Sequence, residues 1–233
     1  MELIWQGLRQ AFHLLVRGDR QVMEIMWLSL RVSGLATVLS LLFGVPVGLL
    51  LALQRFPGRT LALGIVNSGM ALPPVVVGLV VSIAFWRTGP LGFLDLLYTP
   101  TAIVIAQFIL AAPVVAGLTA AAIQQLDPRL RLQLMGLGAS RLQVLGWLLY
   151  EARFSLLAAL MAGFGAVISE VGASMMVGGN ILHYTRVMTT ATVLETTKGN
   201  FDVAIALSVI LLMVTFFLTM GVTTLQQRGT GTR

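Results

Sequence analysis

Residues 28–59 read LSLRVSGLATVLSLLFGVPVGLLLALQRFPGR, and positions 32–53 within this stretch contain no charged side chain. A helix needs about 20 apolar residues to cross the hydrocarbon core of a bilayer. Arg31 precedes the uncharged run, and Arg55 and Arg59 follow it. The stretch therefore predicts a membrane-spanning helix with basic residues at both ends.

Four more runs of this kind follow along the chain. They cover residues 60–86, 96–126, 154–182 and 203–227, with Glu170 as an acidic interruption of the third. Charged residues make up 10% of the chain, against about 25% in soluble domains, and the mean hydropathy is +0.91. We expect an all-α membrane protein with five core transmembrane helices.

Several classes of function are excluded or disfavoured by composition. The chain has no cysteine, and His13 and His183 lie far apart in the sequence, which disfavours a metal site. We find no phosphate-binding loop, no paired carboxylates and no Ser/His/Asp set. A membrane enzyme is therefore the least favoured class, and we expect no catalytic residue. The charged residues among the first 24 positions also argue against a cleavable signal peptide.

Basic residues favour one orientation of the five crossings. With the N-terminus outside and the C-terminus in the cytoplasm, eight Lys and Arg residues fall inside and six fall outside. Cytoplasmic loops carry the excess of Lys and Arg in membrane proteins. The inside set is Arg55, Arg59, Arg129, Arg131, Arg141, Arg153, Arg228 and Arg233; the outside set is Arg9, Arg17, Arg20, Arg87, Arg186 and Lys198.

The two ends of the chain predict short accessory segments. In residues 1–22, Ile4, Leu8, Phe12 and Leu15 follow helical spacing. Such a helix lies in the membrane interface, with Trp5 as an anchor, or packs on its own protein. Residues 227–233 predict a short cytoplasmic tail, without a regulatory domain after it.

The stretch 124–153, QQLDPRLRLQLMGLGASRLQVLGWLLYEAR, is too polar to span a membrane and too apolar for a solvated linker. Asp127 followed by Pro128 is typical of a helix start. Gly136 and Gly138 permit a turn, and a second helix is expected to begin near Ser140. Such a short helix docks on a partner or packs on its own bundle.

Within this stretch, Leu137-Gly138-Ala139-Ser140-Arg141 resembles the EAA loop of ABC-importer permeases of the binding-protein-dependent transport family. Leu132-Gln133-Leu134 stands where that family usually has Glu-Ala-Ala. The resemblance implies a cytoplasmic coupling loop at about 127–146 that fits a cleft on an ATP-binding subunit. The implied coupling residues are Asp127, Leu132, Leu134, Met135, Leu137, Gly138, Ala139, Ser140 and Arg141.

Other segments resemble the molybdate and tungstate branch of these permeases. Ala71-Leu72-Pro73-Pro74 resembles the double-proline break of oxyanion permeases, Glu170–Ala173 and Gly178–Asn180 resemble the molybdate and tungstate branch, and 185–199 is most similar to tungstate permeases. The resemblance covers about residues 25–226, the expected permease domain.

This resemblance implies a subunit that imports a tetrahedral oxyanion, most similar to tungstate permeases, across the cytoplasmic membrane of a prokaryote. Its expected partners are a second permease copy, two ATP-binding subunits and an extracytoplasmic binding protein. ATP and Mg are expected on the ATP-binding partner, with no cofactor on this chain. Molybdate, sulfate or phosphate is an alternative cargo. An ATP-independent secondary transporter or channel is an alternative class, disfavoured by the few spans and the single deep carboxylate.

Polar and proline residues inside the spans suggest a pathway. Proline within a span frees backbone carbonyls that need partners in protein or in a water-lined cavity, so the double proline marks a gate or a packing kink. Ser and Thr serve as anion donors or as packing residues between helices. The candidate pathway residues are Pro73, Pro74, Ser169, Ser174, Asn180, Thr189 and Thr190.

Glu170 is a candidate functional residue, because ionisable groups within a span usually have a specific role. A carboxylate repels an oxyanion, so contact with the cargo is disfavoured. We expect either a structural ion pair with Arg31, at similar depth in the membrane, or hydrogen bonds from the carboxyl group to nearby broken backbone.

Overall fold

A computed structural model describes residues 2–230 as a bundle of helices, with no strand in that range. The elements in chain order are α1 (Glu2–Arg17), α2 (Arg20–Leu53), α3 (Arg59–Met70), α4 (Pro74–Phe85), the 3-10 turn η1 (Gly92–Leu94), α5 (Pro100–Gln124), α6 (Pro128–Gly136), α7 (Arg141–Glu151), α8 (Arg153–Ile168), α9 (Gly172–Gly178), α10 (Met188–Thr197) and α11 (Phe201–Thr230).

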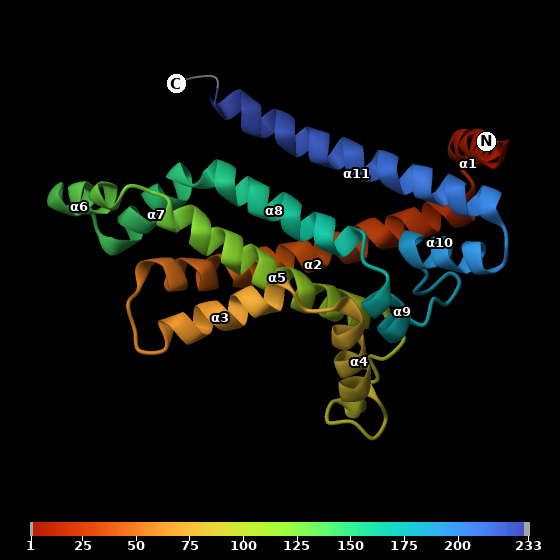
Figure 1. Cartoon of the computed structure of the whole chain (residues 1–233), viewed down its shortest axis with the longest axis horizontal. Helices are drawn as coiled ribbons and strands as arrows, with labels where there is room; N and C mark the ends of the chain where they lie inside the picture. Colours follow the sequence, from red (N-terminus) through yellow and green to blue (C-terminus); the bar gives the residue numbers. More distant parts are fainter. Residues whose placement is uncertain (1, 231–233) are drawn as a thin grey trace.

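The long helices α2, α5 and α11 run roughly along the long axis of the molecule (Figure 1). The helices α6 and α7 lie at one end, and α1 and α10 lie at the other. The helix α4 projects sideways from the bundle. The segment that resembles a coupling loop is therefore far from the N-terminal helix.

The helices α2 and α5 form the centre of the bundle. A Cβ atom on Gly48 would approach the carbonyl oxygen of Ala116 to 2.6 Å and Cβ of Thr119 to 2.6 Å. One on Gly44 would approach Val115 Cγ1 to 2.9 Å. Small residues let helix backbones come close in membranes. The Gly44–Gly48 pair therefore mediates a close contact between α2 and α5.

Three helices are long and apolar enough to cross a membrane singly, namely α2, α5 and α11. Two pairs reach this length only when each is taken as one bent span: α3 with α4, bent by 100°, and α7 with α8, bent by 67°. The described residues thus contain three to five candidate spans, and the predicted run 154–182 begins in α8, after the α7 helix of the second bent pair. The bend between α3 and α4 lies where the sequence predicts a double-proline break within the run 60–86.

The helix in the predicted run 154–182 also ends earlier than the sequence suggested. The helix α8 stops at Ile168, and the short α9 begins at Gly172 after a break at 169–171. Hydropathy stays high through residue 182, but the chain turns because the Glu170 carboxylate binds the backbone nitrogens that open α9. Hydropathy shows that the segment is apolar, but it does not show that the Glu170 side chain caps α9.

The terminal helices pack on each other. Ala11 of α1 is 1% exposed within a cluster that includes Leu207 and Ile210 of α11. Trp5, Phe12 and Val16 of α1 remain exposed. The helix α11 continues to Thr230, so the tail expected at 227–233 begins inside a helix, and its residues 231–233 lie outside the described part of the chain, as does Met1.

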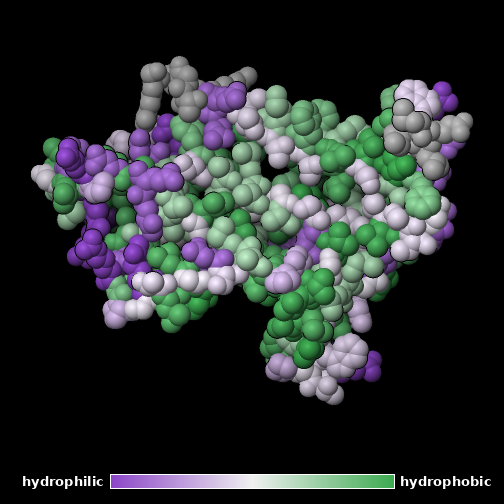
Figure 2. Space-filling model, in the orientation of Figure 1, coloured by the Kyte–Doolittle hydropathy of each residue, from purple (hydrophilic) through white to green (hydrophobic). Residues whose placement is uncertain are grey.

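The surface divides by polarity along the long axis (Figure 2). Hydrophilic residues gather at the end formed by α6, and hydrophobic residues predominate over the middle and over α4. An apolar middle zone with a polar end is the pattern expected of a chain that crosses a bilayer.

Candidate functional site

The α6 helix begins as its sequence predicts. The Asp127 carboxylate Oδ1 accepts a hydrogen bond from the Arg129 nitrogen at 2.8 Å, and Pro128 occupies the first helical position. Proline loses nothing there, because the first backbone nitrogens of a helix have no partner within the helix. Asp127 and Pro128 therefore fix where the chain leaves α5 and turns into α6.

The turn between α6 and α7 depends on Gly138 and Ser140. Gly138 has φ of +83°, a conformation that costs residues with a Cβ roughly 1–2 kcal/mol. Ser140 caps α7 in a reciprocal box, in which its hydroxyl accepts from the Gln143 nitrogen at 3.4 Å and its nitrogen donates to Gln143 Oε1 at 2.8 Å. The two helices thus have defined ends on either side of a four-residue turn.

The residues predicted to couple to a partner divide into two groups. Leu134 and Ala139 are half-buried and pack against a cluster that includes Leu49, Ile123 and Val144. The others are exposed: Asp127, Leu132, Met135, Leu137, Gly138, Ser140 and Arg141. The inner group attaches α6 and α7 to α2 and α5, while the outer group forms the surface.

Apolar exposure peaks at the turn itself. Leu137 is 85% exposed and Leu142 is 81% exposed, on either side of the Gly138 turn. Large apolar side chains at a polar end of a molecule mark interaction surfaces when they cluster. Leu142 was not among the predicted residues. Its position in the first turn of a capped helix, beside Arg141, nevertheless indicates an exposed side chain.

The exposed face of α7 beside this turn was also not identified from the sequence. Trp147 and Tyr150 are 57% and 55% exposed, with ring centroids 5.9 Å apart in an edge-on arrangement. The Arg153 guanidinium lies 4.0 Å from the Tyr150 ring centroid. With Gln143 and Gly146 these rings line a shallow hollow of about 380 Å³. Helical spacing of Gln143, Trp147 and Tyr150 is the signal that would have revealed this face.

The chain breaks at 71–73, before α4, and at 169–171, before α9, and these two breaks lie close together in the apolar zone. Pro73 is extended, with ψ of 126°, and Pro74 begins α4. A Cβ on Gly172, which begins α9, would approach Val75 Cγ2 to 2.9 Å, and one on Gly78 would approach Ala173 Cα to 2.7 Å. The helices α4 and α9, each following a break, are therefore packed together through small residues. Pro73 and Pro74 produce a sharp bend rather than a mild kink.

Glu170 closes the second break with hydrogen bonds. Its Oε1 accepts from the Ala173 nitrogen at 2.6 Å, and its Oε2 accepts from the Ser174 nitrogen at 2.9 Å and the Ser174 hydroxyl at 2.6 Å. Its backbone oxygen accepts from the Thr189 hydroxyl at 2.8 Å. The side chain is buried and satisfied by donors at the start of α9, where the helix dipole also favours a negative charge.

The structure does not contain the alternative ion pair between Glu170 and Arg31. Arg31 forms no ion pair with Glu170 or with any other described residue. Similar depth along two helices does not imply the same face: Arg31 is exposed, whereas Glu170 is 5% exposed. Arg31 instead lines a cleft near the start of α2.

The predicted pathway hydroxyls and amide are bonded within the chain. The Thr190 hydroxyl donates to the Val187 oxygen at 3.0 Å, and the Asn180 amide donates to the Thr190 oxygen at 3.3 Å. Ser169 is exposed and donates to the Gly165 oxygen at 2.7 Å. Together with Ser174 and Thr189 on Glu170, these groups link side chains and backbone within segment 165–190, which includes α9 and the start of α10.

Metal chemistry receives no support from the described residues, in which no three His, Cys, Asp or Glu side chains lie together as a metal site would require. The described residues thus present an exposed apolar turn at one end and a pair of broken helices in the apolar zone.

Comparison with known proteins identifies the family. The model for the family described as "Binding-protein-dependent transport system inner membrane component" matches residues 44–230. The chain belongs to this family. The match includes α3 through α11 and therefore both the α6–α7 turn and the breaks that precede α4 and α9.

Relatives of this inner membrane component match over nearly its whole length. It is 40% identical to the tungstate uptake system permease protein TupB of Peptoclostridium acidaminophilum, over 97% of this chain and 100% of the relative. It is 36% identical to the protein of the same name from Campylobacter jejuni, over 94% of this chain and 91% of the relative.

A solved structure shares the fold of this inner membrane component. The inward-facing MetNI methionine ABC transporter includes a chain that matches with a TM-score of 0.74 over 89% of this chain and 95% of that chain, at 19% identity. The arrangement of helices is therefore that of a chain of this ABC transporter.

Proposed function

We propose that this inner membrane component is the permease subunit of an ATP-driven importer of a tetrahedral oxyanion, tungstate in the first instance. The two relatives named as tungstate permeases support this cargo over most of their length. Molybdate, sulfate and phosphate share the tetrahedral shape and the negative charge, and they are the competing cargoes.

The docking surface at the α6–α7 turn carries the proposal. Leu137 and Leu142, flanking Gly138, expose apolar side chains at the polar end of the molecule. Buried apolar anchors dominate the affinity of protein interfaces. An ATP-binding subunit that holds ATP and Mg would cover this turn, and this chain would bind no cofactor itself.

Docking of the ATP-binding subunit at the α6–α7 turn implies an orientation of the chain in the membrane. The α6–α7 end faces the cytoplasm, where ATP is available, so α1 and the start of α2 lie on the outer side. The chain then crosses five times, as α2, α3–α4, α5, α7–α8 and α11. The exposed Trp5 and Phe12 of α1 favour a helix that also contacts the membrane interface.

The complete importer contains two copies of this chain, two ATP-binding subunits and an external binding protein that delivers the anion. The permease domain is residues 25–226, with the coupling loop at 127–146. One face of α4 is apolar and exposed at Val75, Leu79, Val80 and Ile83. A second copy that covers this projecting face would remove the α4 lobe from lipid.

Motion passes from the docking turn to the membrane through packed side chains. Leu134 and Ala139 contact the cluster of Leu49, Ile123 and Val144, which joins α6 and α7 to α2 and α5. Closure of the ATP-binding subunits would shift the population between inward-open and outward-open states, because each state has different contacts with the partner. The bends at 71–73 and at Ala152 are the places where the spans can change direction.

Co-purification with the ATP-binding subunit tests the proposal. Gly138→Asp adds a charge and backbone strain at the turn, and Gly199→Asp adds the same charge at the opposite end. Both glycines have positive φ, +83° and +81°, and no atom within 4 Å of an added Cβ. We expect Gly138→Asp to lose the partner and Gly199→Asp to retain it. Equal retention by both variants contradicts docking at this turn.

A further inference from the structure

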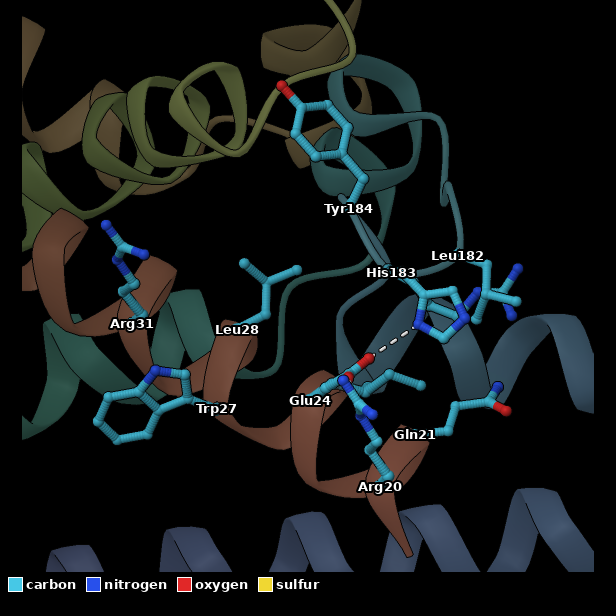
Figure 3. Close-up of a pocket in the computed structure, with 11 residues that line it drawn as sticks. Arg20, Gln21, Glu24, Trp27, Leu28, Arg31, Leu182, His183 and Tyr184 are labelled. Atoms are coloured by element: carbon cyan, nitrogen blue, oxygen red, sulfur yellow. Dashed lines mark hydrogen bonds and ion pairs between the residues drawn. The ribbon is translucent and has the colours of Figure 1, made fainter.

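A cleft of about 660 Å³ lies between the first turns of α2 and the loop that precedes α10 (Figure 3). It is at the end of the molecule opposite α6 (Figure 1). Three arginines, Arg20, Arg31 and Arg186, line it with one glutamate, Glu24, so its lining has a net charge of +2 when His183 is neutral. This cleft has no role in docking the ATP-binding subunit.

Arg31 is the least satisfied of these cations. It is exposed and makes no hydrogen bond or ion pair with a described residue. Arg20, by contrast, donates to Glu24 at 3.0 Å, and Arg186 donates to the Asn180 side chain at 3.2 Å. A free guanidinium presents five donors with no acceptor from the protein.

The position of Arg31 makes its lack of a partner significant. It follows Arg20 by eleven residues on α2, which is about 16 Å along the helix axis. It directly precedes the uncharged run 32–53 of this candidate span. An arginine at the edge of an apolar zone needs water, a partner or an anion to satisfy its charge. The open cleft beside Arg31 provides water and access for an anion.

The loop that forms the other wall is held rigidly. The buried Thr185 hydroxyl donates to the Gly178 oxygen at 2.5 Å and accepts from the Ile181 nitrogen at 2.9 Å. Between these anchors His183 adopts φ of +61°, and its Nδ1 lies 2.8 Å from Glu24 Oε2, which joins the loop to α2. The positions of Arg186 and His183 are thus set before any ligand arrives.

We propose that this cleft is an entry site that receives the tetrahedral oxyanion on the outer side before it passes between the helices. The inference rests on the proposed function, and it adds a site on this chain. Arg20 and Arg31 lie about 16 Å apart along α2, whereas a lipid headgroup lies at one depth, so their arrangement favours an anion in transit. The Arg20 side chain is 93% exposed, and such open charge attracts anions without retaining them.

The test is the initial rate of tungstate uptake by the complete importer in phosphatidylcholine vesicles, at limiting tungstate. Removing a guanidinium lowers the local anion concentration, so we expect Arg31→Gln to reduce the rate about tenfold. Arg31→Lys should retain most of the rate, because the charge remains. Arg9→Gln is the matched control, since it removes a charge from exposed α1, outside the cleft.

Three results would overturn the entry site. One is an Arg31→Gln rate equal to that of Arg9→Gln. Another is a loss of affinity for the binding protein by the same factor as the loss of uptake, which would make the cleft a protein-docking surface. The third is a deficit that appears only with phosphatidylglycerol in the vesicles, which would make the ligand a lipid headgroup. A wild-type complex that imports no tetrahedral oxyanion would instead contradict the proposed function, and the entry site with it.

Discussion

The Glu170 carboxylate accepts hydrogen bonds from both the backbone nitrogen and the hydroxyl of Ser174, at 2.9 and 2.6 Å. With the Ala173 nitrogen on its other oxygen, it closes the start of α9 inside the apolar zone. This relationship explains how an acidic residue is accommodated there without a basic partner: the charge is held by donors that α9 would otherwise leave unpaired.

Glu170→Gln should destabilise the protein. Its amide group must turn an N–H₂ toward a donor that the carboxylate now satisfies, which leaves buried donors unpaired at about 1–3 kcal/mol. We expect a lower thermal midpoint in detergent for Glu170→Gln and an unchanged midpoint for Arg31→Gln. If Arg31→Gln lowered the midpoint as much, the two side chains would be coupled as an ion pair after all.

Gly48→Ala should weaken the contact between α2 and α5. Its Cβ would lie 2.6 Å from the Ala116 oxygen, whereas an added Cβ on Gly34 in the same helix meets nothing within 4 Å. Overpacking costs about 1–3 kcal/mol. Thermal unfolding should show a lower midpoint for Gly48→Ala and no loss for Gly34→Ala. Equal midpoints for the two variants would argue against the close packing.

Leu137→Ala should weaken binding of the ATP-binding subunit. An apolar anchor at the centre of an interface contributes about 2 kcal/mol or more, so the dissociation constant should rise at least tenfold. Phe93→Ala is the control, because Phe93 is 77% exposed on η1 and Leu137 is 85% exposed on the docking turn. Titration of the labelled subunit measures both. A similar affinity for both variants would remove Leu137 from the interface.

Local signals made parts of this fold predictable from sequence. Asp127 with Pro128, and Gly138 with Ser140, act on backbone within a few residues, so α6 begins and ends, and α7 begins, where the sequence indicates. The uncharged runs likewise predict the spans α2, α5 and α11, because hydropathy is a property of each segment alone.

Non-local contacts account for what the sequence did not reveal. The 100° bend between α3 and α4 is stabilised where Gly78 meets Ala173 of α9, far along the chain. The partners of Glu170 include Thr189, and those of Asn180 include Arg186. No spacing rule relates these positions, so the pathway hydroxyls could not be distinguished from packing residues. The basic cleft likewise joins α2 to a loop more than 150 positions away, as His183 to Glu24 shows.

The most direct test of the proposed function is tungstate accumulation in vesicles that contain this chain with its ATP-binding subunit and binding protein. We expect tungstate to accumulate above its external concentration only when ATP is present on the side of the membrane that the α6–α7 turn faces. This accumulation should be lost in Gly138→Asp but not in Gly199→Asp. Accumulation that persists without ATP, or in vesicles that contain this chain alone, would contradict it and indicate a transporter independent of an ATPase.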